Sequence, residues 1–527
     1  MASTLADPYV EAAEPLLGPD EHDDSQFPTP EDGDGLADNT KRRLRITTQF
    51  QVQNPATIIL LLSVLMLLIT TSGMMYMIPI FRLVEDAFCH VYYDKDPSEP
   101  IDERLCKTDA VQGRLAFLGG VGAMMNSFVG VVSALPYGIL ADRIGRKPSF
   151  ILAYVGIVVG FGWAPLLLAI GATPSIPLVV SGSLFFLIGG GVPVAMNCLN
   201  AMASDISSES DRSTGFLYLS FGAVSGTLVG PFLAGILMEK VSPWFPIFLV
   251  FAITPFVFGI LVFLPETLPI KLKQATQEDA QPILTKIREA GKELMISLNL
   301  LRNTNILLSM AVFFLQPILF HASSSTMVQY VSKYFGWTLA QTSYLLSPPL
   351  SILHLLIIVA LPRIAKIFTD PTGRFLLSIF SKDILLTKIS LLFLLAGALL
   401  EGFSQEIVMF LIGLVVSTLG SATSPLGRAV VTAYVDPQQT SRLYGLISLL
   451  DTFGLSIGGP TLAWSFNIGL SRKGLWRGLP WFVVASFIMA ALIALLFVTN
   501  PEKPSDTASS EEEDSSGLGY QSASEET

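Results

Sequence analysis

The sequence predicts an all-α polytopic membrane protein with about twelve transmembrane helices in two sets of six. Of its 527 residues, 51% are hydrophobic and only 14% are charged, and the mean hydropathy is +0.57. A water-soluble chain of this length needs more charged residues to cover its surface, so the excess apolar residues must face lipid. Six apolar stretches of membrane-spanning length precede a polar segment, and six more follow it.

The net charge of −11 comes from the two ends of the chain. Residues 1–40 hold eleven acidic residues and no Lys or Arg, and residues 501–527 hold eight acidic residues and one Lys. We therefore expect disordered acidic tails at 1–50 and 500–527, because such segments bury too little apolar area to offset the entropy of ordering. No cleavable signal peptide precedes the first apolar run near Ala56, so the first helix is expected to act as the targeting signal.

A helix needs about 20 apolar residues to cross the hydrocarbon core. The first six predicted spans are 56–80, 113–138, 149–170, 178–203, 214–238 and 244–264. The last six are 305–330, 344–366, 385–403, 407–432, 443–468 and 479–499. We therefore expect a first bundle at 51–266, a polar linker at 267–303 and a second bundle at 304–499.

Basic residues predict how these helices are oriented. Four groups lie before helix one, after helix two, in the linker and after helix eight: Lys41, Arg42, Arg43 and Arg45; Arg143, Arg146 and Lys147; Lys271, Lys273, Lys286, Arg288 and Lys292; Arg363, Lys366, Arg374 and Lys382. All four groups fall on one side, which we expect to be cytoplasmic together with both termini. One group disagrees, because it falls on the opposite side: Arg472, Lys473 and Arg477.

The segment 205–231 recurs as the segment 436–460. The matched positions are Asp205 with Asp436, Arg212 with Arg442, Gly215 with Gly445, Gly230 with Gly459 and Pro231 with Pro460. The Arg and Gly recur at an offset of 230 residues, and the Gly-Pro pairs recur at 229. Matches in corresponding helices indicate two duplicated halves.

The loop between helices two and three carries the most specific short motif, Gly138-Ile-Leu-Ala-Asp142-Arg143-Ile-Gly145-Arg146-Lys147. Gly138 is expected to allow close contact with a neighbouring helix. Asp142 is expected to face the positive N-terminal end of helix eleven, near Arg442. With its basic residues paired to nearby acids, the loop could close the cytoplasmic side in one state and release it in another. A basic loop that only sets the topology is the simpler alternative.

This motif resembles the corresponding loop of the major facilitator superfamily, and the resemblance extends over residues 50–500. The helix-five segment Gly226-Thr-Leu-Val-Gly230-Pro231-Phe-Leu-Ala234-Gly235 is similar to a motif of proton-driven drug antiporters. Pro265-Glu266-Thr267 is a common family ending of helix six. Asp205-Ile-Ser-Ser and the stretch around Arg428 resemble the proton-coupled folate transporter and tetracycline exporter branches. The resemblance implies two pseudo-symmetric six-helix bundles around a cavity that opens alternately to each side.

Helix four departs from the antiporter pattern. Antiporters of this kind often carry an Arg in helix four, whereas this chain has Leu187-Ile-Gly189-Gly190-Gly191 with no Arg nearby. The coupling ion and the direction of transport therefore stay open. In helix five, Pro231 removes a backbone donor, and its small neighbours predict a close-packing stripe that contacts the opposite bundle or bends to close the cavity. Ordinary small-residue packing is the alternative.

Charged side chains in the bilayer centre cost about 2.5–3.5 kcal/mol and need a partner or a cavity. Arg428 in helix ten and Asp451 in helix eleven are expected to form a salt bridge that protonation of Asp451 would release. This pair is the leading candidate for proton coupling, and a static structural pair is the alternative. His321 and His354 are further candidates because imidazole titrates near neutrality, although a buried His often serves packing. Glu401, near an outer helix end, is expected to reach water.

Neutral polar residues are expected to line the cavity: Asn126, Asn197, Asn200, Tyr218, Gln316 and Gln329. Cys89 and Cys106 share one polar loop and could form a disulfide if that loop faces an oxidising compartment, a question the sequence leaves open. No metal site is expected, because the four histidines lack the spacing of metal ligands.

We therefore expect a secondary transporter of a small organic solute, and not an enzyme, with no cofactor and no nucleic-acid partner. The sequence lacks the Gly-x-x-x-x-Gly-Lys-Ser/Thr loop of ATP-driven pumps. Proton-coupled export is favoured, proton-coupled uptake is the runner-up, and a non-transporting membrane sensor is the alternative of another class. Glu14-Pro15-Leu16-Leu17 resembles a dileucine sorting signal, so the plasma membrane and a vacuolar or lysosomal membrane both stay open.

Overall fold

The chain is helical throughout the part that the structure describes. The computed structural model describes residues 51–97, 99–171, 175–207, 212–268, 283–369, 378–435, 439–472 and 474–500, and no strand occurs in these ranges. The tails, Glu14, Leu16 and Leu17 of the predicted sorting signal, and residues 269–282 of the linker therefore lie outside the described residues.

The first half contains α2 (Pro55–Tyr93), η1 (Glu103–Cys106), α3 (Asp109–Ile144), α4 (Arg146–Ala169), α5 (Ile176–Val180), η2 (Ser181–Leu187), α6 (Gly191–Ile206), α7 (Arg212–Lys240) and α8 (Trp244–Phe263). The linker contributes α10 (Ile283–Ser297) and η3 (Leu298–Arg302). The second half contains α11 (Thr304–His321), η4 (Ala322–Thr326), α12 (Met327–Phe335), α13 (Leu339–Thr369), α14 (Ile379–Phe403), α15 (Ile407–Leu419), α16 (Thr423–Thr432), α17 (Thr440–Ser471), η6 (Gly474–Gly478) and α18 (Leu479–Leu496).

Eleven helical spans within the described residues are long and apolar enough to cross a membrane. The helix α13, 31 residues long, takes the place of the remaining predicted span. A helix suits this environment because it satisfies its backbone hydrogen bonds internally, which lipid cannot do. Exposed apolar side chains such as Phe248 and Phe256 give these helices an outer surface that matches lipid.

The structure corrects one predicted boundary and adds a helix to the linker. The predicted span 56–80 is part of a 39-residue helix, α2, which continues to Tyr93 and carries Pro79 in its interior. The linker, predicted as a polar loop, contains the helix α10. The first span was predicted to end where charged residues begin. The helix continues past its apolar stretch because those charged side chains form ion pairs with one another.

Two predicted continuous helices are interrupted, and a third contains a π segment. The predicted span 178–203 breaks between η2 and α6, where Gly189, Gly190 and Gly191 all have positive φ angles. A Cβ at Gly189 would collide with the backbone of Leu152 and Ala153, so the glycines let the chain cross α4 closely. Helix seven contains a five-residue π segment, η4, and helix ten is interrupted between α15 and α16.

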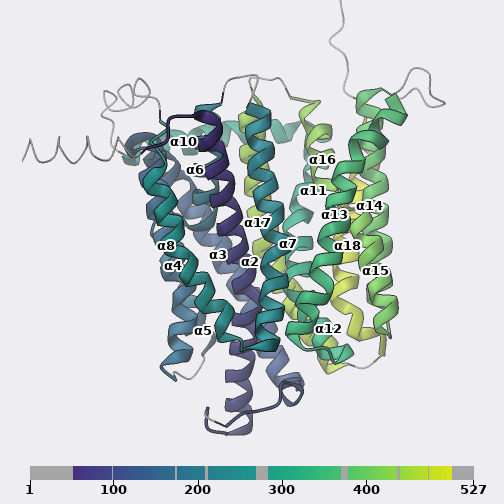
Figure 1. Cartoon of the computed structure of the whole chain (residues 1–527). Helices are drawn as coiled ribbons and strands as arrows, with labels where there is room; N and C mark the ends of the chain where they lie inside the picture. Colours follow the sequence, from purple (N-terminus) through teal and green to yellow (C-terminus); the bar gives the residue numbers. More distant parts are fainter. Residues whose placement is uncertain are drawn as a thin grey trace, which may run out of the picture. The chain divides into compact units, whose positions relative to one another are not determined.

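Each half packs around its own apolar core, and the halves meet along two helix pairs. In the first half, α2 packs against α7 and α8; in the second, α14 packs against α15 and α18. Between the halves, α3 packs along α17, and α7 packs along α13. Figure 1 shows the purple-to-teal helices on one side, the green-to-yellow helices on the other, and α7 and α17 at the boundary.

The two ends of the helices differ in what they carry. The end of α2 and the loop that leads to α3 lie at one end, which we call the disulfide end. The helix α10 lies at the opposite end, which we call the linker end (Figure 1).

Candidate functional site

Glycines bring α3 and α17 into close contact across the boundary between the halves. A Cβ at Gly120 would lie 2.7 Å from the Ala463 Cβ and 2.8 Å from the Gly459 carbonyl oxygen. Nearer the disulfide end, the Asn467 side-chain amide donates to the Gly113 carbonyl at 3.3 Å. Gly459 belongs to the repeated Gly-Pro pair, so the duplicated position in helix eleven serves contact between the halves.

The predicted close-packing stripe of helix five is present and has two faces. A Cβ at Gly230 would lie 2.8 Å from the Met74 Cβ on α2, and Gly226 is similarly close to Thr70. On the other face, a Cβ at Gly235 would lie 2.8 Å from the Ala340 carbonyl oxygen on α13.

Pro231 links this stripe to the second half of the chain. The Ser343 hydroxyl on α13 donates to the Pro231 carbonyl at 2.6 Å. Helix five thus contacts the opposite half, as one of the sequence hypotheses required.

Three cavities, of about 540, 360 and 130 Å³, lie in the described part of the chain, and the 540 Å³ cavity, called the larger cavity below, is lined by both halves. Pro231 and Thr227 on α7 and Met74 on α2 form its wall in the first half. Its polar lining comes almost entirely from the second half: Gln316, Ser323, Ser347, Ser351, His354, Glu401, Ser417, Thr418 and Ser421. The volume falls in the range of about 300–1,000 Å³ that small-molecule sites occupy.

The cavity of about 360 Å³, called the smaller cavity below, lies mainly in the first half. Asn126 on α3 lines it, and His321, Ser324 and Leu455 border it from the second half. Phe320 lines both cavities, so its ring lies at the boundary between them.

Of the six neutral residues predicted to line the cavity, Asn126 and Gln316 do so. Gln329 was a wrong choice, because it is 4% exposed on α12, where the helix turns this face into the core of the second half. The other three line neither cavity: Asn197, Asn200 and Tyr218.

The predicted salt bridge between Arg428 and Asp451 is not formed. No ion pair joins these two residues within 4.0 Å, although both belong to the described part of the chain. The Arg428 guanidinium lies over the Tyr444 ring instead, 5.8 Å from its centroid. The partner of Arg428 is therefore the Tyr444 ring, one turn into α17, and not the predicted Asp451.

Glu401 was also misjudged. Its side chain is 2% exposed and lines the larger cavity, where its Oε1 accepts a 2.6 Å hydrogen bond from the Ser417 hydroxyl. Helical side chains tilt toward the N-terminus of their own helix, and α14 begins at the linker end. The carboxylate therefore points into the protein and not toward the nearby loop. The direction of the helix, which the predicted topology gives, is the signal that predicts a buried Glu401 side chain.

The loop motif forms a cluster that stays within the first half. We call Asp142, Arg146, Asp205 and Glu266 the motif cluster. Asp142 pairs with Arg146 at 2.6 Å, and the Arg146 Nε lies 3.4 Å from Asp205. The Glu266 carboxylate accepts from the backbone N–H groups of Arg146 and Lys147 at 2.9 and 3.2 Å, which caps α4.

Gly145 explains why this loop needs a glycine. Its φ of +116° is unfavourable for other residues, and a Cβ there would lie 2.7 Å from the Glu266 Cδ. Glu266 closes the first half, so the two family-like motifs, far apart in sequence, are in direct contact.

Among the described residues, Asp142 pairs with Arg146 and not with helix eleven, and the close helix contact expected at Gly138 is absent. No atom of the described residues would lie within 4 Å of a Cβ at Gly138 or at Gly445. Yet the register in which Gly120 faces Ala463 would, if continued, bring Gly138 opposite Gly445 and Asp142 opposite the start of α17. The pairing of Asp142 with the start of α17 therefore stays a prediction. Arg442 is exposed, and the side chain of Arg212 lies outside the described part.

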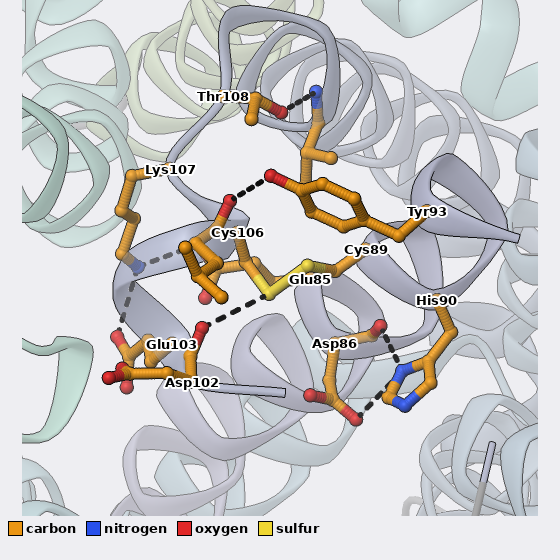
Figure 2. The surroundings of a disulfide bond; sticks show 12 residues. Glu85, Asp86, Cys89, His90, Tyr93, Asp102, Glu103, Cys106, Lys107 and Thr108 are labelled. Atoms are coloured by element: carbon orange, nitrogen blue, oxygen red, sulfur yellow. Dashed lines mark hydrogen bonds and ion pairs between the residues drawn. A yellow bond between two sulfur atoms is a disulfide. The ribbon is translucent and has the colours of Figure 1, made fainter. Parts of the chain in front are cut away.

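The disulfide between Cys89 and Cys106, which the sequence left open, is formed at the opposite end. Beside it, the Glu85 side chain is fully buried and receives the Lys107 ammonium at 2.6 Å and the Gln112 amide at 2.5 Å. We call Arg82, Glu85, Glu103, Lys107 and the disulfide the disulfide cluster; Figure 2 shows Lys107 beside Glu103, with Glu85 and the two cysteines close by.

The disulfide cluster reaches across to the second half. The Glu103 Oε1 accepts from the backbone N–H of Leu339, the first residue of α13, at 2.9 Å. Lys333 on α12 lies 2.6 Å from Asp109 and also donates to the Lys107 carbonyl. The Lys333–Asp109 ion pair and the hydrogen bonds of Glu103 and Lys107 thus join the halves at the disulfide end.

Comparison with known proteins identifies this architecture. The Major Facilitator Superfamily family model matches residues 115–382 and 357–523. The MFS-type transporter aprT of Aspergillus flavus is 30% identical over 511 residues, which cover 92% of this chain and 98% of that protein. The chain belongs to the Major Facilitator Superfamily.

Two further comparisons support the assignment. The MFS efflux pump atnC of Emericella nidulans is 29% identical over 438 residues, covering 81% of this chain and 84% of the pump. Among solved structures, a D-xylose–proton symporter superposes with a TM-score of 0.59 at 14% identity, over 85% of this chain and 99% of that chain. The protein is thus an integral membrane secondary transporter of the major facilitator fold.

The basic residues that violated the predicted orientation of this major facilitator protein have aromatic partners. The Arg472 guanidinium lies 4.6 Å from the Trp476 ring centroid, and that of Arg477 lies 5.6 Å from the Tyr334 ring. Lys473 is outside the described residues. Cation–π contacts stabilise these charges locally, so their position on the disulfide end has a structural cause.

Proposed function

We propose that this major facilitator protein exports a small organic solute in exchange for protons, by alternating access. The observation that carries the proposal is the larger cavity, which both halves line between two ends that are bonded differently. Rocking of one half against the other would open such a cavity to each side in turn. The relatives support export, since one is named an efflux pump and covers most of the chain.

The difference between the two ends supports a state in which the cavity is closed at the disulfide end. Glu103, Lys107 and Lys333 connect the halves there. The motif cluster connects only helices of the first half. Opening the disulfide end requires breaking the first set, and closing the linker end would bring Asp142 toward the positive N-terminus of α17.

Asp451 is the leading candidate for the proton site. It lies one helical turn before Leu455, which borders the smaller cavity, so both residues share one face of α17. Without a salt bridge to Arg428, its carboxylate needs a proton or a cation when water is excluded. His321 and His354, which line the two cavities, are the next candidates.

The linker end is proposed to be cytoplasmic. The basic residues Arg143, Arg146 and Lys147 lie there, as the positive-inside rule requires. The disulfide lies at the opposite end, which suits an oxidising exterior or lumen. Both the plasma membrane and a vacuolar or lysosomal membrane meet this requirement, and sorting through Glu14, Leu16 and Leu17 remains a prediction.

The test is flux driven by a pH gradient in proteoliposomes, with a mixed panel of metabolites and dyes. Wild type is expected to move at least one solute against its concentration gradient and opposite to the protons. Asp451→Asn is expected to retain exchange but lose uphill movement, because its amide cannot carry a proton. Asp94→Asn is the matched control, since Asp94 is exposed at the end of α2.

Each other outcome has a defined meaning. Solute movement in the same direction as the protons would indicate uptake and overturn export. Wild-type behaviour of Asp451→Asn would remove Asp451 from the coupling mechanism and leave His321 and His354 to be tested. A panel in which nothing moves under any gradient would favour the sensor alternative.

A further inference from the structure

The larger cavity contains one buried carboxylate that the transport proposal does not use. Glu401 is 2% exposed, and no basic side chain within the described residues forms an ion pair with it. Its hydrogen-bonding partner is the neutral Ser417 hydroxyl. Of the other residues that line the cavity, His354 is the one that can carry a positive charge.

Two glycines make room for this carboxylate. A Cβ at Gly413 would lie 2.8 Å from the Glu401 Cγ, so any larger residue would displace the side chain. A Cβ at Gly397 would collide with the Ser417 hydroxyl that donates to the carboxylate. The contact between α14 and α15 is therefore built around Glu401 and Ser417, and the carboxylate is held in a fixed position.

The same cavity offers polar atoms without partners and an aromatic wall. The Trp481 Nε1 and the Ser421 hydroxyl are buried and have no hydrogen-bond partner among the described residues. Trp481 packs edge-on against Tyr330 and Phe410, with ring centroids 5.7 and 5.4 Å apart, so its ring is fixed in the wall of the cavity. Buried polar groups of this kind normally have partners, and a bound ligand can supply them: a donor for the Ser421 hydroxyl, and an acceptor atom elsewhere on the ligand for the indole N–H of Trp481.

We propose that the larger cavity binds an organic cation, a protonated amine or quaternary ammonium, with Glu401 as its counter-ion and Trp481 as its aromatic wall. A buried carboxylate attracts a positive charge strongly because water does not screen it. Aromatic faces add a cation–π contribution, and Trp provides the strongest. The hydroxyl groups of Ser417 and Ser421 can accept from the N–H groups of a protonated amine.

This inference rests on the proposed function, since it names the solute class of the same cavity. The test measures equilibrium binding, which does not require transport. Tritiated tetraphenylphosphonium, a permanent aromatic cation, is the probe, and neutral triphenylphosphine oxide is the competitor of similar shape. Purified full-length protein in lipid nanodiscs is used for wild type, Glu401→Gln, Glu401→Asp and Glu406→Gln. Glu406 is the matched control because it is an exposed carboxylate in the adjoining loop.

Wild type is expected to bind the cation at least about tenfold more tightly than the neutral competitor. Glu401→Gln should lose about tenfold affinity for the cation and keep its affinity for the neutral compound. Glu401→Asp should recover part of the loss, and Glu406→Gln should match wild type. Unchanged neutral binding and an unchanged thermal unfolding midpoint show that the Gln variant is folded.

Two results would overturn the inference: wild type that does not bind the cation, or Glu401→Gln that binds it as tightly as wild type. If solutes nevertheless move in the flux assay, the proposed function stands and only the solute class is wrong. If the cation binds through Glu401 but no gradient moves any solute, the site stands and the transport proposal fails.

Discussion

The disulfide cluster and the motif cluster both combine acidic and basic residues at helix ends, but among the described residues the disulfide cluster bonds to the second half and the motif cluster bonds within the first. Glu103 and Lys107 belong to the first half and bond to Leu339 and Lys333 of the second. Asp142, by contrast, pairs with Arg146 four residues away. The comparison indicates that the two clusters are not closed at the same time. Alternating access would then exchange one set of cross-half bonds for another.

The largest expected effect comes from removing the buried carboxylate of the disulfide cluster. Glu85→Gln removes the fully buried carboxylate that Lys107 and Arg82 share and leaves them Glu103 and Asp86, and losing a buried ion-pair partner costs about 3–5 kcal/mol. Thermal unfolding can be followed by labelling Cys198, the free buried thiol. Asp86→Asn is the control, because its side chain is 36% exposed and exposed pairs contribute about 0–1 kcal/mol. Equal unfolding midpoints for the two variants would contradict the prediction that buried Glu85 contributes more stability than exposed Asp86.

A somewhat smaller effect is expected from opening the disulfide. Cys89 and Cys106 are 17 residues apart, and closing a loop of this size stabilises a fold by about 3 kcal/mol. The Cys89→Ser, Cys106→Ser double variant should unfold at a lower temperature when unfolding is followed by intrinsic tryptophan fluorescence, because a thiol label would react with the reductant and with the freed Cys89 and Cys106. Reductant should lower the midpoint of wild type and leave the double variant unchanged. A wild-type protein that is insensitive to reductant when unfolding begins would contradict this prediction.

The Lys333–Asp109 ion pair between the halves is expected to set the fraction of molecules closed at the disulfide end and to leave the stability of the fold unchanged. Lys333→Met removes the ion pair with Asp109, and a loss of about 1 kcal/mol shifts a two-state equilibrium about fivefold. A cysteine in place of Asn126, which lines the smaller cavity, should then react about fivefold faster with a membrane-impermeant reagent added outside. Lys95→Met is the control, because Lys95 pairs with Glu99 in its own loop. Equal labelling rates for both variants would show that Lys333 does not hold the disulfide end closed.

The smallest effect on stability, but a clear effect on transport, is expected at Gly138. A side chain there meets nothing in this state, and replacing a helical Gly by Ala can stabilise by up to about 1 kcal/mol. Gly138→Leu should keep the wild-type unfolding midpoint yet slow solute flux about fivefold, because closing the linker end would place it against Gly445. Gly259→Leu, another glycine in open space, should transport normally. Normal solute flux by the Gly138→Leu variant would show that Gly138 has no role in closing the linker end.

Sequence patterns predicted the features that depend on local chemistry. Apolar stretches gave the twelve helical segments, and the pairing of Cys89 with Cys106 was a stated alternative. The small residues at Gly226 and Gly230 predicted close packing because glycine has few other uses in a membrane helix. The sequence patterns missed features that depend on the direction of a side chain or on the conformation of the transporter. Glu401 looked exposed because its distance from the helix end was considered and the tilt of its side chain was not.

Two other errors have the same origin. Arg428 and Asp451 lie at similar depths on adjacent helices, but depth does not give azimuth, and Arg428 faces Tyr444. Asp142 was predicted to face helix eleven, but it pairs with Arg146 four residues away. The sequence did not predict the backbone break at Gly189 or the π segment after His321, because hydropathy does not distinguish a regular helix from an interrupted or distorted one.

The central claim is that the two ends open and close in opposition, and paired distances test it most directly. Spin labels would be placed at Lys95 and Leu475 for the disulfide end, and at Ile144 and Tyr444 for the linker end. All four positions are exposed, and the background carries Cys198→Ser and keeps the native disulfide. Electron–electron resonance distances would be compared between this background and its Lys333→Met variant. We expect the variant to gain a longer distance at the disulfide end and a shorter one at the linker end, in equal fractions. Distances that change at one end alone, or in the same direction at both ends, would contradict the claim.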